Sequence, residues 1–139
     1  MHNLLRISEA TSLGFHSMAL MSLRRERLSV REMAELLHVS EAHLSKVLQQ
    51  LFRKGLVISH RGPRGGFELA LPPESISLMD IYEALEGSPQ RGVCLLNCRE
   101  CPFGKCFLGE PIHKMEQEFV AFLRDTTLAA VRERERDEK

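Results

Sequence analysis

All four cysteines of the chain lie within thirteen residues, in the stretch CLLNCRECPFGKC at positions 94 to 106, with the spacing C-x3-C-x2-C-x4-C. Two zinc knuckles normally need a longer separation between their cysteine pairs. An iron–sulfur cluster accepts thiolates at short, irregular spacings. The pattern therefore favours an iron–sulfur cluster held by Cys94, Cys98, Cys101 and Cys106. Zinc and a bare thiol redox switch are the alternatives, and the spacing does not distinguish a 2Fe-2S from a 4Fe-4S cluster.

The residues between the cysteines fit the cluster interpretation. Pro102 follows Cys101 directly, as a proline follows some cluster ligands. Gly104 allows the backbone to wrap closely around a cluster. The positive charges of Arg99 and Lys105 would offset the negative charge of a thiolate-ligated cluster.

The chain has 139 residues and a formal net charge of zero, so any electrostatic footprint for nucleic acid must be local. Residues 42–67 supply one, because they contain no acid while Glu41 and Glu68 stand just outside. The bases of this stretch are Lys46, Arg53, Lys54, Arg61 and Arg64, with His43 and His60.

No segment predicts membrane insertion or export. The longest uncharged run, residues 10–23, has 14 residues, whereas a membrane helix needs roughly 20 apolar ones. The first residues contain only Arg6 as a positive charge, and no A-x-A cleavage pattern follows. We therefore expect a cytoplasmic protein, and in that reducing compartment clustered cysteines are more often metal ligands or redox groups than disulfides.

Three helices are predicted in the first 54 residues. Apolar residues at helical spacing indicate one over about 9–25, and Ser29 with Glu32 forms a capping-box pattern before the second. Ser40 begins the third, which Gly55 ends. The second helix is expected to bury Val30, Met33, Leu36 and Leu37, and the third Leu44, Val47, Leu48 and Leu51.

Two extended stretches, 56–61 and 67–71, flank the turn sequence GPRGG and predict a β-hairpin with a basic tip. A short helix follows from Ser77 to Gly87. A long helix is expected from Pro111 to about Arg132, followed by a solvated, frayed tail. Ile112, Met115, Phe119, Phe122 and Thr126 recur every three or four residues along it, and two copies of the chain would pack through Met115, Phe119, Phe122 and their neighbours.

Two capped helices, a tight turn and a hairpin make a winged helix-turn-helix, in which the second helix of the motif enters the major groove of DNA. The expected fold is therefore mainly α with a small β-hairpin wing and a long C-terminal dimerisation helix. The candidate DNA contacts are Ser40, Ala42, His43, Ser45 and Lys46 on the helix, and Arg61 and Arg64 on the wing. The competing interpretation is a helical hairpin whose charges only face solvent.

The stretches SVREMAELLHVSEAHLSKVLQQLFRKGLVISHRGPRGGFELAL and SLMDIYEALEG resemble the Rrf-two family of bacterial regulators. The resemblance implies a homodimer that binds palindromic promoter DNA, and for many members a cluster that senses iron–sulfur, redox or nitric oxide status. It implies DNA contacts at the seven positions named above. The expected elements divide the chain into a DNA-binding domain (1–87), a cluster-binding loop (88–110) and a dimerisation helix with a charged tail (111–139).

The cysteine loop departs from the family's pattern of three cysteines. It has a fourth, and Gly109 stands where some relatives carry a ligating histidine. Other relatives use an aspartate from the first helix of the partner, which Glu9 matches here. We rank all four cysteines first as the ligand set, then Glu9 and then His113 as the fourth ligand. A redox enzyme or electron carrier, and a scaffold stapled by zinc, are the rival functions.

Overall fold

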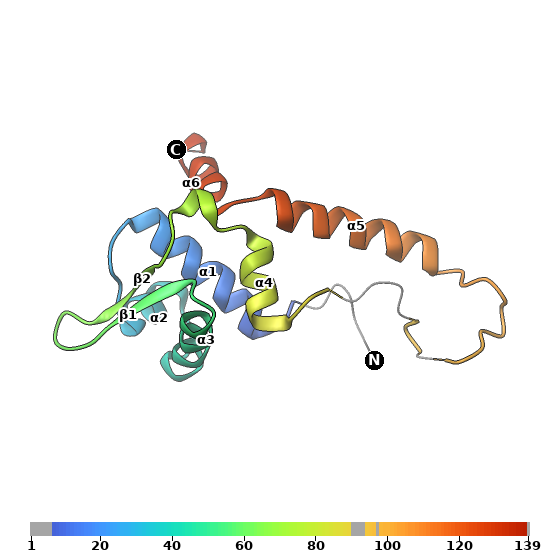
Figure 1. Ribbon diagram of the computed structural model, residues 1–139, viewed down its shortest axis with the longest axis horizontal. Helices are drawn as coiled ribbons and strands as arrows, with labels where there is room; N and C mark the ends of the chain where they lie inside the picture. The colour runs from blue at the N-terminus through green and yellow to red at the C-terminus, as the bar shows by residue number, and fades with distance from the viewer. Residues whose placement is uncertain (1–6, 90–93, 97, 139) are drawn as a thin grey trace.

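The computed structural model describes residues 7–89, 94–96 and 98–138. The predicted architecture is confirmed: helices predominate, and the only sheet in the described part is a two-stranded antiparallel hairpin (Figure 1). In chain order the elements are α1 (Glu9–Arg24), α2 (Val30–Leu37), α3 (Glu41–Arg53), β1 (Val57–His60), β2 (Gly66–Leu69), the 3-10 helix η1 (Pro73–Ser75), α4 (Leu78–Glu86), α5 (Gly109–Asp125) and α6 (Leu128–Asp137).

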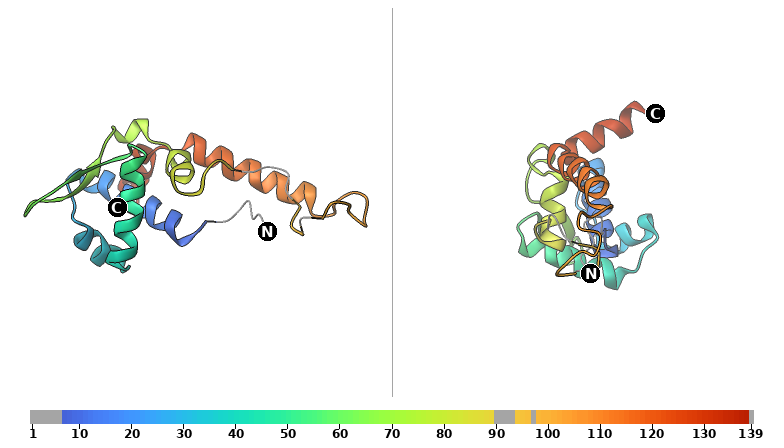
Figure 2. Two further views of the ribbon diagram at one scale, coloured as in Figure 1. Left: turned by 60° about the horizontal axis from the view of Figure 1, so that its bottom comes forward. Right: turned by 90° about the vertical axis from the view of Figure 1, so that its right-hand side faces the viewer.

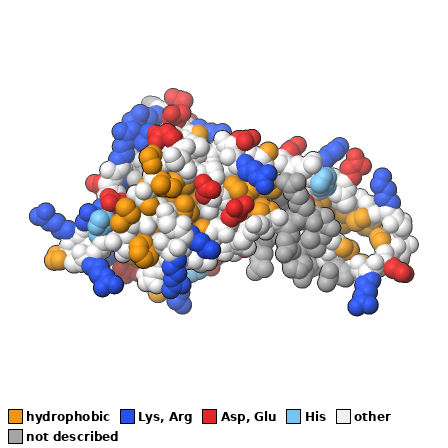
Figure 3. Space-filling view, in the orientation of Figure 1, with side chains coloured by type: hydrophobic (Ala, Val, Ile, Leu, Met, Phe, Trp, Pro, Cys, Tyr) orange, Lys and Arg blue, Asp and Glu red, His pale blue; other side chains and the backbone are white. Residues whose placement is uncertain are grey.

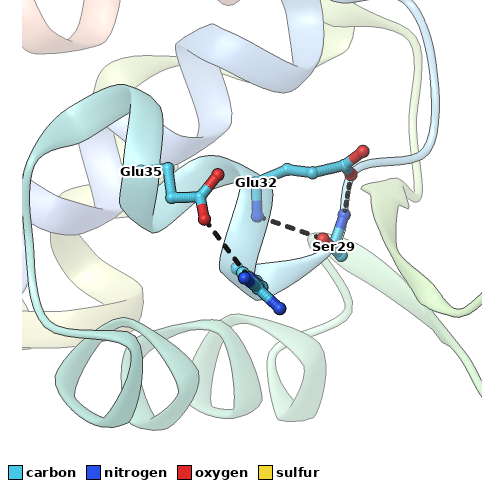
Figure 4. A network of polar contacts seen from close by, with 4 residues as sticks. Ser29, Glu32 and Glu35 are labelled. Atoms are coloured by element: carbon cyan, nitrogen blue, oxygen red, sulfur yellow. Dashed lines mark hydrogen bonds and ion pairs between the residues drawn. The ribbon is translucent and has the colours of Figure 1, made fainter.

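Short polar side chains start α2, α3 and α4, as predicted, whereas α5 begins at Gly109, before the predicted Pro111, and has no side-chain cap. At α2 the Glu32 backbone N–H donates to Ser29 Oγ at 3.1 Å, and the Ser29 N–H donates to Glu32 Oε2 at 2.7 Å (Figure 4). This reciprocal pair satisfies two of the backbone donors that every helix leaves unpaired at its start. Ser77 and Asp80 form the same arrangement at α4.

The main core lies where α1, α3 and the hairpin meet. Met18, Leu44, Leu48 and Leu51 are fully buried there, as the apolar spacing of the third helix predicts. The prediction for Leu36 is wrong, because its side chain is 46% exposed. At about 100° per residue, Leu36 lies well off the stripe that runs through Met33 and Leu37.

The hairpin is tied to the residues before α2. Its register pairs Val57 with Leu69 and His60 with Gly66. The strand predicted to reach Leu71 ends at Leu69, and Leu71 is exposed. An isolated bridge joins Phe67 to Leu28, so the wing is fixed to the entrance of the helix-turn-helix.

The C-terminal segment differs from the single helix predicted to run to about Arg132. The chain breaks at Thr126, whose carbonyl accepts from the Leu78 N–H at 2.9 Å, and the Leu128 N–H donates to the Ile76 carbonyl at 2.9 Å. Thr127 then caps a new helix. Leu128 is fully buried in the main core, so α6 packs back onto the N-terminal body, and the expected frayed tail is helical to Asp137.

Helix α5 projects from this body as an arm, with the cysteine loop at its far end (Figures 1 and 2). Val120 and Leu123, in its second half, pack on Met79 and Tyr82 of α4. None of the helices described here has the length and apolar character needed to cross a membrane.

Candidate DNA-binding surface and cysteine loop

The first turns of α3 face outward. Ser40 caps the helix by accepting from the His43 N–H at 3.3 Å, while Leu44 and Leu48 anchor the opposite face in the core. His38, in the left-handed region at φ 56°, makes the tight turn from α2. Of the predicted contacts on this helix, Ser40, Ala42 and Lys46 are exposed, and His43 and Ser45 are half-buried. The five side chains therefore share one end of a rigidly seated helix, as insertion into a major groove requires.

Arg61 and Arg64 are exposed at the tip of the wing. A contact that the sequence did not predict fixes this tip: Arg27 Nη1 donates to the Arg64 carbonyl at 3.0 Å. The wing is also held by the bridge between Phe67 and Leu28. This bridge requires a glycine at position 66, since a Cβ there would clash with the Leu28 carbonyl oxygen. The only sequence signal for Arg27 is its place just before the capping box of α2.

Basic side chains gather around the wing and on the lower part of the body (Figure 3). A groove of about 460 Å³ runs along the outer face of α3 and is lined by Lys46, Gln49, Gln50, Arg53 and Lys54. Lysine, arginine and amide side chains are the groups that bind phosphate oxygens in protein–DNA complexes.

The structure brings one candidate cluster ligand to the recognition helix. Glu9 Oε1 lies 3.5 Å from His43 Nδ1, and the glutamate is exposed. The sequence suggested separate roles for these residues and gave no sign of their contact. His113 is exposed on α5.

Four thiols lie on the turns between α4 and α5. Cys98, Cys101 and Cys106 are exposed and Cys94 is half-buried. Cys94 Sγ and Cys98 Sγ are 3.7 Å apart, and their hydrogen bond is the main cause that raises the pKa of Cys98 above its ordinary 9.0. Within residues 7–89, 94–96 and 98–138, no three His, Cys, Asp or Glu side chains form a group that could hold a metal ion.

The donor chemistry nevertheless fits a thiophilic metal group. Two thiolates on one tetrahedral metal ion, with bonds of about 2.3 Å, lie about 3.8 Å apart. The Cys94–Cys98 separation of 3.7 Å, which is that of a thiol hydrogen bond, is also close to that of two ligands of one ion. Cys101 and Cys106 lie on adjoining turns closed by backbone hydrogen bonds from Gly104 and Gly109.

Comparison with known proteins decides the family. Residues 7–134 match the model of the Rrf2 family, the Rrf-two family above, described as an iron-dependent transcriptional regulator. The chain belongs to the Rrf2 family. This Rrf2 protein is therefore a DNA-binding transcriptional regulator and not an enzyme.

Several relatives of this Rrf2 protein match it over most of their length. A protein of Aquifex aeolicus (strain VF5), provisionally named an HTH-type transcriptional regulator, is 30% identical over 125 residues, which are 87% of each chain. CymR, the global cysteine regulator of B. subtilis, has a TM-score of 0.77 and 27% identity over 93% of this chain and 97% of its own. IscR of T. potens has a TM-score of 0.69 and 26% identity, and the match covers 97% of this chain and 89% of the IscR chain.

Proposed function

We propose that this Rrf2 protein is a homodimer that binds promoter DNA and senses iron–sulfur, redox or nitric oxide status through a cluster on its cysteine loop. The observation that carries the proposal is the pair of thiols 3.7 Å apart within a loop that gathers all four cysteines of the chain. DNA would be read by Ser40, Ala42, His43, Ser45 and Lys46 of α3 and held by Arg61 and Arg64 of the wing.

Exposed apolar side chains support a dimer. At about 100° per residue, Met115 and Phe122 share a face of α5 that lies beside the face packed on α4. Both are exposed, as are Leu96, Phe103 and Phe107 of the cysteine loop. A projecting helix with an uncovered apolar face is typical of a helix that packs on a second copy.

The cluster would be held by Cys94, Cys98, Cys101 and Cys106, with Glu9 and His113 as lower-ranked ligands. Such a group supplies a centre that gains or loses electrons, or breaks down, in response to its surroundings. The cysteine loop would transmit the signal, because a cluster bound by all four thiols would order the turns before α5. Because α5 carries the dimer contact, a change at its start would alter the spacing of the two recognition helices on DNA.

A thiol switch without a cluster is the second candidate, and the same contact favours it. A disulfide needs the two sulfurs at about 2.05 Å, so Cys94 and Cys98 are within a short approach of bonding. A solved structure of Staphylococcus aureus CymR in an oxidized form has a TM-score of 0.71 and 26% identity. A zinc ion held by the four thiols is the remaining possibility from the same ligand set.

Anaerobic purification of the full chain, with iron and sulfide counts and an absorption spectrum, distinguishes these candidates. The cluster proposal expects brown protein with both elements. Colourless protein with zinc, or without metal, would overturn it.

Binding to the protein's own promoter fragment, measured at several salt concentrations, then tests the coupling. Cys94→Ser should abolish both iron loading and the difference in DNA affinity between loaded and stripped protein. Arg61→Ala is the matched control, since it should weaken DNA binding and leave the iron content unchanged. DNA affinity that is the same in loaded, stripped and C94S protein would contradict the sensor mechanism.

A further inference from the structure

A cavity of about 590 Å³ lies between the wing and the C-terminal helix, away from the cysteine loop. Its walls come from β2 and the residues after it, from the end of α1, and from Arg132 of α6. In Figure 1 α6 lies at the top of the body and α3 at the bottom, so the cavity is not part of the recognition surface. Its volume is in the range of small-molecule sites, about 300–1,000 Å³.

Two buried polar atoms without partners belong to residues that line this cavity. Among the described residues, Ser22 Oγ and Arg132 Nε are the buried side-chain nitrogen or oxygen atoms that lack a hydrogen bond. Ser22 is 1% exposed, and the Arg132 side chain is 14% exposed. Buried polar groups are nearly always satisfied, so two exceptions from different helices on one cavity indicate a missing partner.

We propose that this cavity binds a small amino-acid-like zwitterion. Arg132 Nη2 is 3.8 Å from Glu74 Oε1, beyond hydrogen-bond distance, so the guanidinium retains donors for a second acceptor. Guanidinium groups bind carboxylates through two parallel N–H bonds, and Arg132 is therefore the carboxylate-binding residue. Arg25 contributes a second positive charge, and the Ser22 hydroxyl a further hydrogen bond.

The acids of the cavity select against a purely anionic ligand. Glu26, Glu68 and Glu74 line it together with the two arginines, which gives the walls a net negative charge. Glu68 is paired with His60 at 2.9 Å and Glu74 lies 3.8 Å from Arg132, which leaves Glu26 to receive an amine. Met21, Leu69, Leu71 and Pro72 form the apolar part, which suits an aliphatic side chain.

Such a ligand would act on the wing, because β2 forms one wall and α6 another. A bound ligand would favour the position of the wing for which it has the higher affinity. This effector site is independent of the cysteine loop, and the proposal does not rest on the cluster.

Calorimetry on the full chain with the twenty common amino acids, up to about 10 mM, tests the site, since this exceeds a millimolar Kd about tenfold. We expect at least one aliphatic amino acid to bind. The corresponding amine and the corresponding carboxylic acid, each lacking one charge, should bind at least about tenfold more weakly.

Arg132→Gln should weaken binding at least about tenfold, and Ser22→Ala several-fold. Arg136→Gln, an exposed arginine one turn further along the same helix and outside the cavity lining, is the matched control and should leave Kd unchanged. If R132Q does not fold, Arg25→Gln at the exposed end of α1 replaces it and should weaken binding about threefold or more. Absence of binding by every amino acid, which would mean that water alone satisfies the two atoms, overturns the proposal, as does an unchanged Kd in the folded arginine variant.

Discussion

Glu9 Oε1, at the start of α1, lies 3.5 Å from His43 Nδ1 on the recognition helix. The contact joins a residue considered as a cluster ligand to a residue considered as a base contact. A carboxylate can contact a histidine through one oxygen and bind a metal through the other. Glu9 is therefore a candidate link between cluster binding and DNA binding, whichever residues hold the cluster.

A double-mutant cycle tests whether Glu9 positions His43 for DNA. In metal-free protein, Glu9→Gln should weaken operator binding more when His43 is present than in the H43A background. The coupling should be at most about 1 kcal/mol, because the pair is solvent-exposed. Fluorescence anisotropy with an operator duplex measures all four affinities.

Glu41→Gln is the matched control for this cycle, since Glu41 is another exposed acid at the same end of the helix-turn-helix. The effect of E41Q on operator affinity should be the same with and without His43. If E9Q and H43A are also additive, Glu9 contributes only its charge.

The tie between the wing and Leu28 predicts a strong effect at one glycine. In Gly66→Ala the new Cβ would meet the Leu28 carbonyl oxygen at 2.4 Å, in a backbone with φ +143°. We expect a loss of about 1–3 kcal/mol in the free energy of unfolding, and weaker DNA binding, because the bridge to Phe67 must open. Urea unfolding and operator titration measure the two effects.

Gly62→Ala is the comparison for this variant, because its φ is +93° but no atom lies within 4 Å of the added Cβ. G62A has the backbone strain without the clash, so its free energy of unfolding should fall less than that of G66A. An equal loss in both variants would mean that the contact with Leu28 adds nothing.

Local signals explain why most of the fold could be predicted. Ser29 and Glu32 define the start of α2 within four residues, and Gly55, at φ +77°, follows the end of α3. The alternation around Phe67 similarly identifies a strand. Each of these features depends on neighbours in the sequence, which a single chain displays directly.

The features that the sequence did not predict depend on distant residues. The only local signal near Thr126 is the N-cap residue Thr127, and the break is held by hydrogen bonds to Leu78 and Ile76, far away in the chain. The Glu9–His43 contact and the cavity at Ser22 arise in the same way. For the candidate site, the sequence predicted the surface helix and the wing but not the groups that hold them.

Leu128 should make the N-terminal body depend on α6. The side chain is fully buried in the main core, so Leu128→Ala should reduce the free energy of unfolding by about 2–5 kcal/mol. Val131→Ala, on the same helix but only half-buried, should cost clearly less. Thermal or urea unfolding of both variants checks this, and equal small losses would mean that α6 is dispensable.

The exposed face of α5 predicts the effect of a charge on oligomeric state. Met115→Asp places a carboxylate on the face proposed to meet the partner, and should shift the protein from dimer to monomer without unfolding it. Gln117→Asp adds the same charge at a polar exposed position and should leave the dimer intact. Light scattering after gel filtration gives both masses, and a dimeric M115D protein would exclude this face as the interface.

The capping box of α2 predicts a contribution to stability that disappears in acid. The backbone N–H and the side chain of Ser29 hold the pKa of Glu32 below its ordinary 4.5 by hydrogen-bonding to the carboxylate. A carboxyl whose pKa is lower in the folded state stabilises the fold above its unfolded pKa, and this stabilisation is lost as the pH falls through the folded value. The free energy of unfolding should therefore fall as the pH drops below about 4.5.

Two variants isolate this contribution. Glu32→Gln keeps an acceptor for the Ser29 N–H but cannot ionise, and Ser29→Ala removes the hydroxyl at a cost of about 1 kcal/mol near neutral pH. Urea unfolding between about pH 3 and 6 should show E32Q approaching the unmodified protein as the pH falls, because protonation of Glu32 removes the advantage that E32Q lacks. S29A keeps the carboxylate and its hydrogen bond from the backbone N–H, so it should keep most of its deficit. If the stability gap between E32Q and the unmodified protein stays constant over that range, the carboxylate of Glu32 is not the group that titrates, and the capping box stabilises α2 through its neutral hydrogen bonds alone.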